Sequence, residues 1–187
     1  MMTTADEAEA DGGSRDTPAP VARAAKPRTW WLVILVGLLV LAIDQLSKMW
    51  AVAALENKPP TQVLGEFLQL YLVRNPGAAF SLGGSATIVI SLIAVGITVV
   101  LMFRARNLRS VWWALAMGTM IGGALGNLTD RVFRAPGGLQ GHVVDFLQLP
   151  YWPIFNFADM AVVGAAIAMV ILTLLGVNFD GTRGDQS

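Results

Sequence analysis

The chain has 187 residues, of which 55% are hydrophobic and only 14% are charged, and its formal net charge is zero. This composition is too apolar for an ordinary water-soluble domain and indicates a membrane protein. The zero net charge gives no support to nucleic-acid binding, and the absence of cysteine excludes disulfides, thiol nucleophiles and thiolate metal sites. Because His142 is the single histidine, we expect no metal and no cofactor.

Four apolar stretches dominate the chain after a polar tail. In residues 1–27 the hydrophobic residues show no regular spacing, and this segment is expected to be disordered. A bilayer core of ~30 Å takes roughly 17–25 helical residues to cross, and backbone groups in lipid must be paired within helices. We therefore predict an all-α membrane protein with four transmembrane helices and a small extracytoplasmic β-sheet. The predicted membrane domain covers residues 28–178, and a second polar tail covers residues 179–187. The four predicted spans are residues 30–54, 86–103, 111–128 and 159–177.

Basic residues beside the spans predict the orientation. Such residues concentrate on the cytoplasmic side of membrane proteins, and here they gather in the N-terminal tail and in the link between the second and third spans. We therefore expect both termini in the cytoplasm. These basic residues are Arg15, Arg23, Lys26, Arg28, Arg104, Arg106 and Arg109.

The two outer segments contain short runs with strand composition. Residues 67–73 read as a strand with residues 62–64 as a possible partner, and residues 142–149 form a third such run. We expect a small sheet above the outer ends of the helices. Its exposed Leu and Phe would suit a lipid-bearing partner, or the strands could serve only as a cap on the bundle.

Asp44 and Lys48 are four residues apart on the first predicted helix, so they share a face. One interpretation is an ion pair that neutralises itself near the interface, with Lys48 extending outward to the headgroups. The other is that the pair touches a lipid headgroup or holds a functional site together.

Two further polar clusters flank the outer segments. Asn75 precedes Pro76 and Gly77, a turn signal, and its amide is a candidate donor to a substrate carbonyl. At the end of the third span, Asn127 and Arg131 share a helical face. They could tie down the loop that carries reactive groups, or the segment could be a plain C-terminal cap with an Asp130–Arg131 pair.

Two aspartates carry the clearest chemical signal. Asp145 lies in an apolar strand-like run, and Asp159 opens the fourth span three residues after Asn156, a capping arrangement. Carboxylates at membrane depth are unfavourable and usually serve a task. Two that lie close together tend to share one proton, which is the chemistry of aspartic proteases. A helix N-terminus favours the charged form, so we expect Asp159 to be the more acidic of the two.

These segments together resemble the lipoprotein signal peptidase (signal peptidase II) family. The resemblance covers residues 30–177. It rests on five motifs in order: DQLSK at 44–48, NPGAAFS at 75–81, GNLTDR at 126–131, HVVDF at 142–146 and FNFAD at 155–159.

The resemblance implies an aspartic endopeptidase of the bacterial cytoplasmic membrane. It would remove signal peptides from diacylglyceryl-modified prolipoproteins, cleaving before the lipidated cysteine near the extracytoplasmic face, as a monomer in contact with membrane lipid. Asp145 and Asp159 would be catalytic. The residues implied to support the site or the substrate are Asn75, Asn127, Arg131 and Asn156, and those with a structural role are Asp44, Lys48 and Asp130.

Two other classes of protein stay open on the residues alone. In a small proton-coupled carrier or lipid-handling protein, the carboxylates would relay protons or bind a headgroup. In a scaffold subunit, the polar residues would only hold helices together. Substitution of Asp145 or Asp159 separates the three classes, because only the peptidase loses cleavage activity.

Overall fold

The computed structural model describes residues 27–77 and 84–183. Its helices and strands are α1 (Trp30–Leu55), β1 (Thr61–Leu64), β2 (Leu68–Asn75), α2 (Gly84–Ala105), α3 (Val111–Phe133), β3 (Val143–Gln148) and α4 (Phe157–Leu174). All four helices are long and apolar enough to cross a membrane. The predicted fold class is confirmed. The predicted disorder of the N-terminal tail falls almost wholly outside the described residues.

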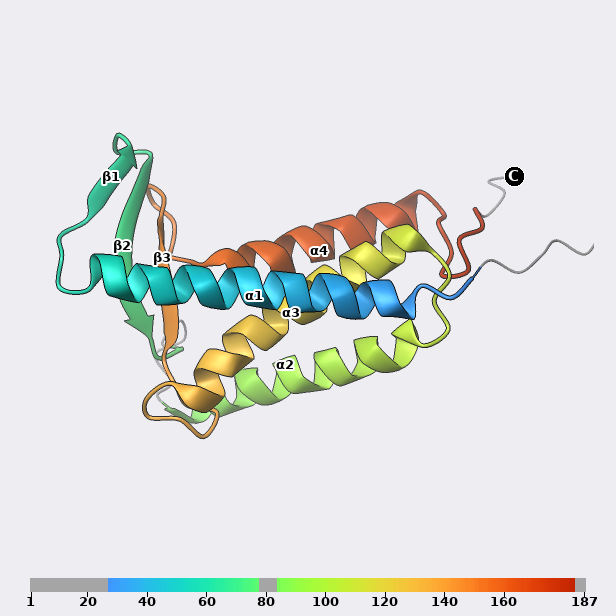
Figure 1. The fold of residues 1–187 in the computed structure, drawn as a ribbon, viewed down its shortest axis with the longest axis horizontal. Helices are drawn as coiled ribbons and strands as arrows, with labels where there is room; N and C mark the ends of the chain where they lie inside the picture. The colour runs from blue at the N-terminus through green and yellow to red at the C-terminus, as the bar shows by residue number, and fades with distance from the viewer. Residues whose placement is uncertain (1–26, 78–83, 184–187) are drawn as a thin grey trace, which may run out of the picture.

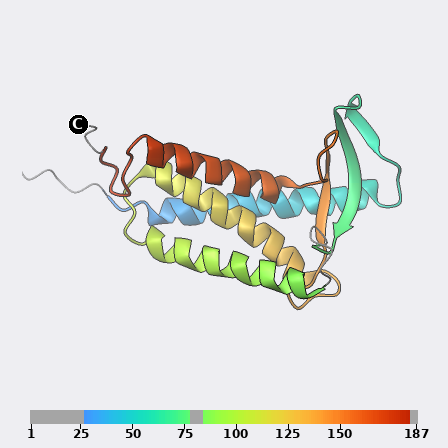
Figure 2. The same ribbon diagram turned by 180° about the vertical axis from the view of Figure 1, so that it is seen from behind.

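The helices run side by side, with the sheet at one end of the bundle and the described chain ends at the other (Figures 1 and 2). Backbone hydrogen bonds join the chain ends to the link between α2 and α3. Thr29 N donates to Leu108 O at 2.8 Å, and Arg109 N donates to Phe179 O at 2.9 Å. The basic flanking residues within the described ranges therefore lie at the end opposite the sheet.

Helix α3 is central and packs against the other three helices. Its glycines explain the close approach of its neighbours. A Cβ atom on Gly122 would lie 2.6 Å from the carbonyl oxygen of Gly37 in α1, and one on Gly123 would lie 2.7 Å from that of Ala158 in α4. Small residues at helix interfaces allow this backbone contact in membranes. Side chains of α1 and α4 that face away from α3 are mostly apolar and exposed, as a lipid-facing surface requires.

Each helix differs from its predicted bounds at one end or both: α1 ends one residue later, and α2 extends two residues further at each end. Helix α3 continues to Phe133 rather than ending at residue 128, because the charged side chains of its last turns have buried partners described below. Helix α4 begins at Phe157 and ends at Leu174, against the predicted 159–177. Asn156 is the N-cap of α4, which places Asp159 in the first turn.

The sheet is antiparallel in the order β1-β2-β3. Strand β1 is exposed along its whole length, whereas Val143 to Phe146 of β3 are buried against the bundle. The chain then turns back on β3, with Phe155 N donating to Leu147 O at 3.0 Å. This return brings Asn156 beside Asp145, and the pairing of Asn75 with Val143 brings the end of β2 to the same place.

Candidate active site

The two predicted aspartates line one cavity. It has a volume of about 190 Å³ and lies where α2, α3 and α4 meet the sheet. Asp145 projects from β3 and is 2% exposed, and Asp159 projects from the first turn of α4. The other polar residues that line this cavity are Ser91, Asn75, Asn127 and Arg131. The fold therefore gathers polar side chains from five elements, namely β2, α2, α3, β3 and α4.

Asn156 fixes both aspartates. Its side-chain oxygen accepts from Asp159 N at 3.1 Å, and its own backbone N–H donates to Asp159 Oδ2 at 3.1 Å, which completes a capping box. Its Nδ2 donates to Asp145 Oδ1 at 2.6 Å. The capping interpretation of this segment is therefore confirmed, and the same side chain also contacts Asp145.

Asn75 is held at three points. Its Oδ1 accepts from Gly77 N at 2.8 Å, its backbone oxygen accepts from Arg131 Nη1 at 3.0 Å, and its Nδ2 donates to Asp145 Oδ2 at 2.8 Å. Gly77 has a φ of 86°, a conformation that L side chains rarely adopt. One N–H of the Asn75 amide is engaged by Asp145, and because an amide nitrogen carries two N–H groups, donation to a substrate carbonyl stays a prediction.

Three asparagine amides turn their nitrogens toward the two aspartates. The oxygen of a side-chain amide only accepts hydrogen bonds and its nitrogen only donates them. A donor bonded to the oxygen therefore determines the side to which the nitrogen points. The side-chain oxygens of Asn75 and Asn156 each accept a hydrogen bond from a backbone N–H, as described above. Asn127 Oδ1 accepts one from Lys48 Nζ at 2.9 Å. Asn127 Nδ2 is thereby directed to Asp159 Oδ1 at 2.8 Å.

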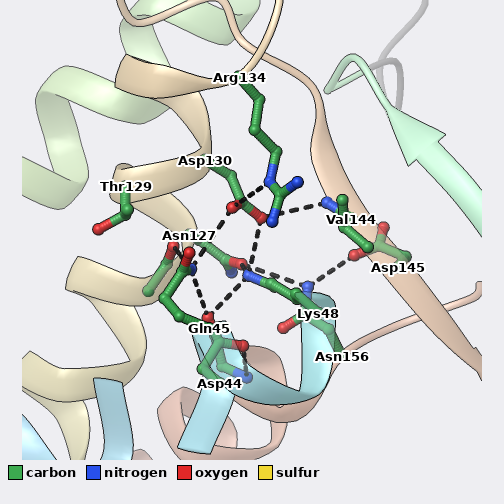
Figure 3. A network of polar contacts seen from close by, with 12 residues as sticks. Asp44, Gln45, Lys48, Asn127, Thr129, Asp130, Arg134, Val144, Asp145 and Asn156 are labelled. Carbon is green, nitrogen blue, oxygen red and sulfur yellow. Dashed lines mark hydrogen bonds and ion pairs between the residues drawn. The ribbon is translucent and has the colours of Figure 1, made fainter. Parts of the chain in front are cut away.

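A second polar cluster lies directly beside the first (Figure 3). Lys48 Nζ lies 2.9 Å from Asp44 Oδ2 and 3.0 Å from Asp130 Oδ2, and all three side chains are 0% exposed. The prediction that Lys48 extends outward to the headgroups is wrong, and so is contact of this pair with a lipid headgroup. The ammonium group points into the bundle because two carboxylates and one amide oxygen are there to receive it.

The predicted Asp130–Arg131 pair is also not formed. Asp130 Oδ1 accepts instead from Arg134 Nε at 2.6 Å. Arg131 Nη1 donates to the backbone oxygens of Asn75 and Gly141, at 3.0 and 2.8 Å. Arg131 thus links α3 to the end of β2 and to the segment that precedes β3.

The buried ion cluster holds the chain next to each cavity aspartate. Val144 N, one residue before Asp145, donates to Asp130 Oδ2 at 3.2 Å. Ala158 N, one residue before Asp159, donates to Asp44 Oδ1 at 3.0 Å. One ammonium group therefore stabilises two carboxylates, and each of these anchors the backbone beside one cavity carboxylate.

Burial raises the pKa of Asp145 to about 6, although the hydrogen bonds from Asn75 and Asn156 lower it. The charge of Asp159 raises the pKa further. Among the described residues, neither Asp145 nor Asp159 has an ion-pair partner within 4.0 Å. No group of three or more His, Asp or Glu in those residues is arranged to hold a metal ion.

Sequence reasoning missed Gln45 and Arg134. Gln45 Nε2 donates to Asp44 Oδ2 at 3.1 Å and to Gly126 O at 3.0 Å, which links α1 to α3. A glutamine within an apolar span is itself a signal, because an unpaired amide is unfavourable in lipid. Arg134 has no such signal, since it follows the last residue of α3 and its partner is identified only by the fold.

The fold and this cavity define a polytopic membrane protein with a carboxylate site at one end of its helices. A sequence profile described as Signal peptidase (SPase) II matches residues 36–175, and the chain belongs to this peptidase family.

Relatives and solved structures agree with this assignment. The chain is 47% identical over 184 residues to a protein named lipoprotein signal peptidase from Rhodococcus jostii, with 97% of this chain and 92% of the relative covered. It is 46% identical to the protein of the same name from Mycobacterium tuberculosis, with 96% and 85% covered. A bacterial membrane enzyme solved by the in meso method at 1.9 Å resolution has a TM-score of 0.70 and 26% identity, with 80% of this chain and 97% of that chain covered.

Proposed function

We propose that this peptidase removes signal peptides from diacylglyceryl-modified bacterial prolipoproteins, cleaving before the lipidated cysteine, with Asp145 and Asp159 as an aspartic dyad. The observation that carries the proposal is the shared cavity: two carboxylates line it, and asparagine amides rather than cations hold them in place. The names of the relatives support the substrate class.

The proposed chemistry needs one protonated and one ionised carboxyl group. The ionised Asp159 takes a proton from a water molecule, whose oxygen forms a bond to the scissile carbonyl carbon. Asp145 gives its proton to the carbonyl oxygen, which yields a tetrahedral diol. The diol then collapses: one of its hydroxyl groups returns a proton to Asp145, the C–N bond breaks, and the leaving nitrogen receives a proton from Asp159, which restores both carboxyl groups. The raised pKa of Asp145 supports its assignment as the member that holds the proton.

Each dyad member has its own positioning groups. Asn75 and Asn156 each donate to a different oxygen of Asp145, so they fix the plane of its carboxyl group. Asp159 receives the Asn127 amide on Oδ1 and the Asn156 backbone on Oδ2. Preorganised geometry of this kind accelerates catalysis because reacting groups need no rearrangement.

The surroundings of the cavity fit a substrate that arrives through the bilayer. Ile90 and Ala94 of α2 belong to its apolar wall, and β1, in the same sheet, exposes Val63 and Leu64. In this proposal the signal helix of the substrate lies along the membrane-spanning helices. Its lipid stays in the outer leaflet, and the dyad lies near the extracytoplasmic face with both termini in the cytoplasm.

The test is cleavage of a lipidated precursor by the purified full-length protein in detergent. Asp145→Asn and Asp159→Asn should each lower the rate about 10³-fold or more, since each removes a group that transfers a proton. Glu66→Gln removes an exposed carboxylate at the same end of the molecule and should leave the rate unchanged.

Two further results separate the proposal from its rivals. Unaltered thermal unfolding of both dyad variants excludes a purely structural role for these side chains. Cleavage that survives both substitutions would reject the dyad, and equal cleavage of a precursor without the diacylglyceryl group would reject the proposed substrate class while leaving the dyad intact.

A further inference from the structure

A second cavity of about 370 Å³ lies at the end of the bundle opposite the sheet. It is formed by the start of α1 and the end of α2. Most of its wall is apolar, and Arg28 and Arg106 are the charged members. The residues that line it are Arg28, Trp30, Val33, Ile34, Met102, Ala105 and Arg106.

The two arginines stand at one membrane boundary. Arg28 lies two residues before the first residue of α1, and Arg106 directly follows the last residue of α2. Both side chains are exposed, and the Arg106 guanidinium carbon lies 4.6 Å from the centre of the Phe103 ring. Within the described ranges, neither arginine forms an ion pair with a carboxylate.

The groove itself follows from the packing of the helices. Helices α1 and α2 both pack on α3. Ile34 and Met102, which lie on the groove, are 48% and 53% exposed. An apolar groove at the level of the lipid chains thus ends in two guanidinium groups that have no carboxylate partner among residues 27–77 and 84–183.

We propose that this groove binds an anionic phospholipid from the leaflet at the end of the bundle that carries the described termini. The two guanidinium groups receive the phosphate, and an acyl chain lies along Val33, Ile34 and Met102. Guanidinium groups form paired hydrogen bonds with phosphate oxygens, and basic pockets between transmembrane helices are typical lipid headgroup sites. The proposal does not depend on the peptidase chemistry, and in the proposed orientation the leaflet is the cytoplasmic one.

The same end of the molecule offers a matched control. A cavity of about 390 Å³ between α2, α3 and α4 has a similar apolar wall, but Arg104 is its only charged residue. Arg104→Gln therefore removes a positive charge from the same membrane boundary without altering the proposed site. If binding depends only on the charge of this boundary, Arg104→Gln weakens it as much as Arg28→Gln or Arg106→Gln alone.

The experiment is native mass spectrometry of the full-length protein in a neutral detergent, titrated with phosphatidylglycerol or with phosphatidylcholine of the same chains. We expect tighter binding of phosphatidylglycerol. Arg28→Gln combined with Arg106→Gln should weaken it about 30-fold, because each basic residue near a headgroup contributes to the attraction. Arg104→Gln should weaken it by less than about threefold, because that residue lines a different cavity. Unchanged melting and peptidase rates show that the double variant is folded.

Three results would overturn the proposal. The first is equal affinity of the wild-type protein for both lipids. The second is a loss in Arg104→Gln as large as the loss in Arg28→Gln or in Arg106→Gln alone. The third is binding that appears only when the acidic side chains of residues 1–26 are replaced by amides, which would make the tail the occupant of the groove. Those acidic residues are Asp6, Glu7, Glu9, Asp11 and Asp16.

Discussion

The molecule contains two pairs of buried or half-buried aspartates within one polar cluster, and their partners differ. Asp44 and Asp130 share the ammonium group of Lys48 and have no exposed surface. Asp145 and Asp159 are held by amide groups and line a cavity. A cation keeps a carboxylate ionised and fixed, whereas amide donors and a neighbouring carboxylate leave it able to exchange a proton. In the proposed mechanism, the partner rather than the residue type therefore separates a structural aspartate from a reactive one.

The two pairs are also physically coupled. Asp130 anchors the backbone of Val144, and Asp44 anchors that of Ala158, so each structural aspartate positions the residue before one dyad member. Asn127 is a side-chain bridge, since it accepts from Lys48 and donates to Asp159. This arrangement explains why a charged cluster is retained inside a membrane bundle.

Loss of the shared cation should have the largest effect on stability. Lys48→Met leaves Asp44 without a compensating charge and Asp130 with Arg134 alone, which should lower the free energy of unfolding by about 3–5 kcal/mol. Chemical unfolding in detergent measures this loss. The matched control adds Asp44→Asn and Asp130→Asn, and it should recover part of the stability because no buried charge is then left unpaired. A Lys48→Met protein as stable as the wild type would contradict the structural assignment of this cluster.

The bridge between the two pairs should affect catalysis and stability together. Asn127→Leu removes the donor to Asp159 and an acceptor of Lys48. Hydrogen bonds to charged groups contribute about 1.5–3 kcal/mol, so kcat should fall roughly 10- to 100-fold. Thr129→Val is the control, because that hydroxyl donates only to Leu125 O at 2.7 Å on the same helix. An equal loss in both variants would show that α3 is merely sensitive to substitution.

The pH dependence of cleavage tests the reactive pair alone. The pKa of Asp145 is about 6, so this carboxyl group is protonated below that pH and ionised above it. Because the mechanism needs its proton, kcat/KM should fall about tenfold for each pH unit well above the pKa. A rate that rises through pH 6 to a plateau would assign the proton to another group.

The smallest effect should come from an exposed ion pair on the same side of the molecule. Arg74 and Glu56 are paired, with side chains 44% and 47% exposed. Water screens such pairs, so Arg74→Gln should cost less than about 1 kcal/mol of stability, and added salt should reduce even that. A loss comparable to that of Lys48→Met would show that burial does not distinguish the two kinds of ion pair.

The sequence predicts the fold well where one pattern determines one element. The apolar runs locate four spans, and the strand-like runs locate the sheet, because length and residue type decide both. It also predicts that Asp145 and Asp159 belong together, through the family motifs. It does not predict the direction of Lys48, because that depends on Asp130, which lies 82 residues away and meets it only after α1 and α3 pack.

The same limit applies to the asparagines. A turn signal identifies Asn75 and a capping signal identifies Asn156, but neither shows that both amides turn their nitrogens toward Asp145. That orientation depends on backbone N–H groups bonded to the amide oxygens, and on the return of the chain after β3. Hydrogen-bond direction is a property of the assembled cluster.

Site-resolved NMR titration of the Asp145 carboxyl carbon shows whether the two cavity carboxylates share a proton. In the wild-type protein we expect this group to titrate at a pH of about 6. In Asp159→Asn its pKa should fall, because a neighbouring negative charge is removed. A wild-type value near the ordinary aspartate value of about 3.9, or a value unmoved by Asp159→Asn, would contradict the account.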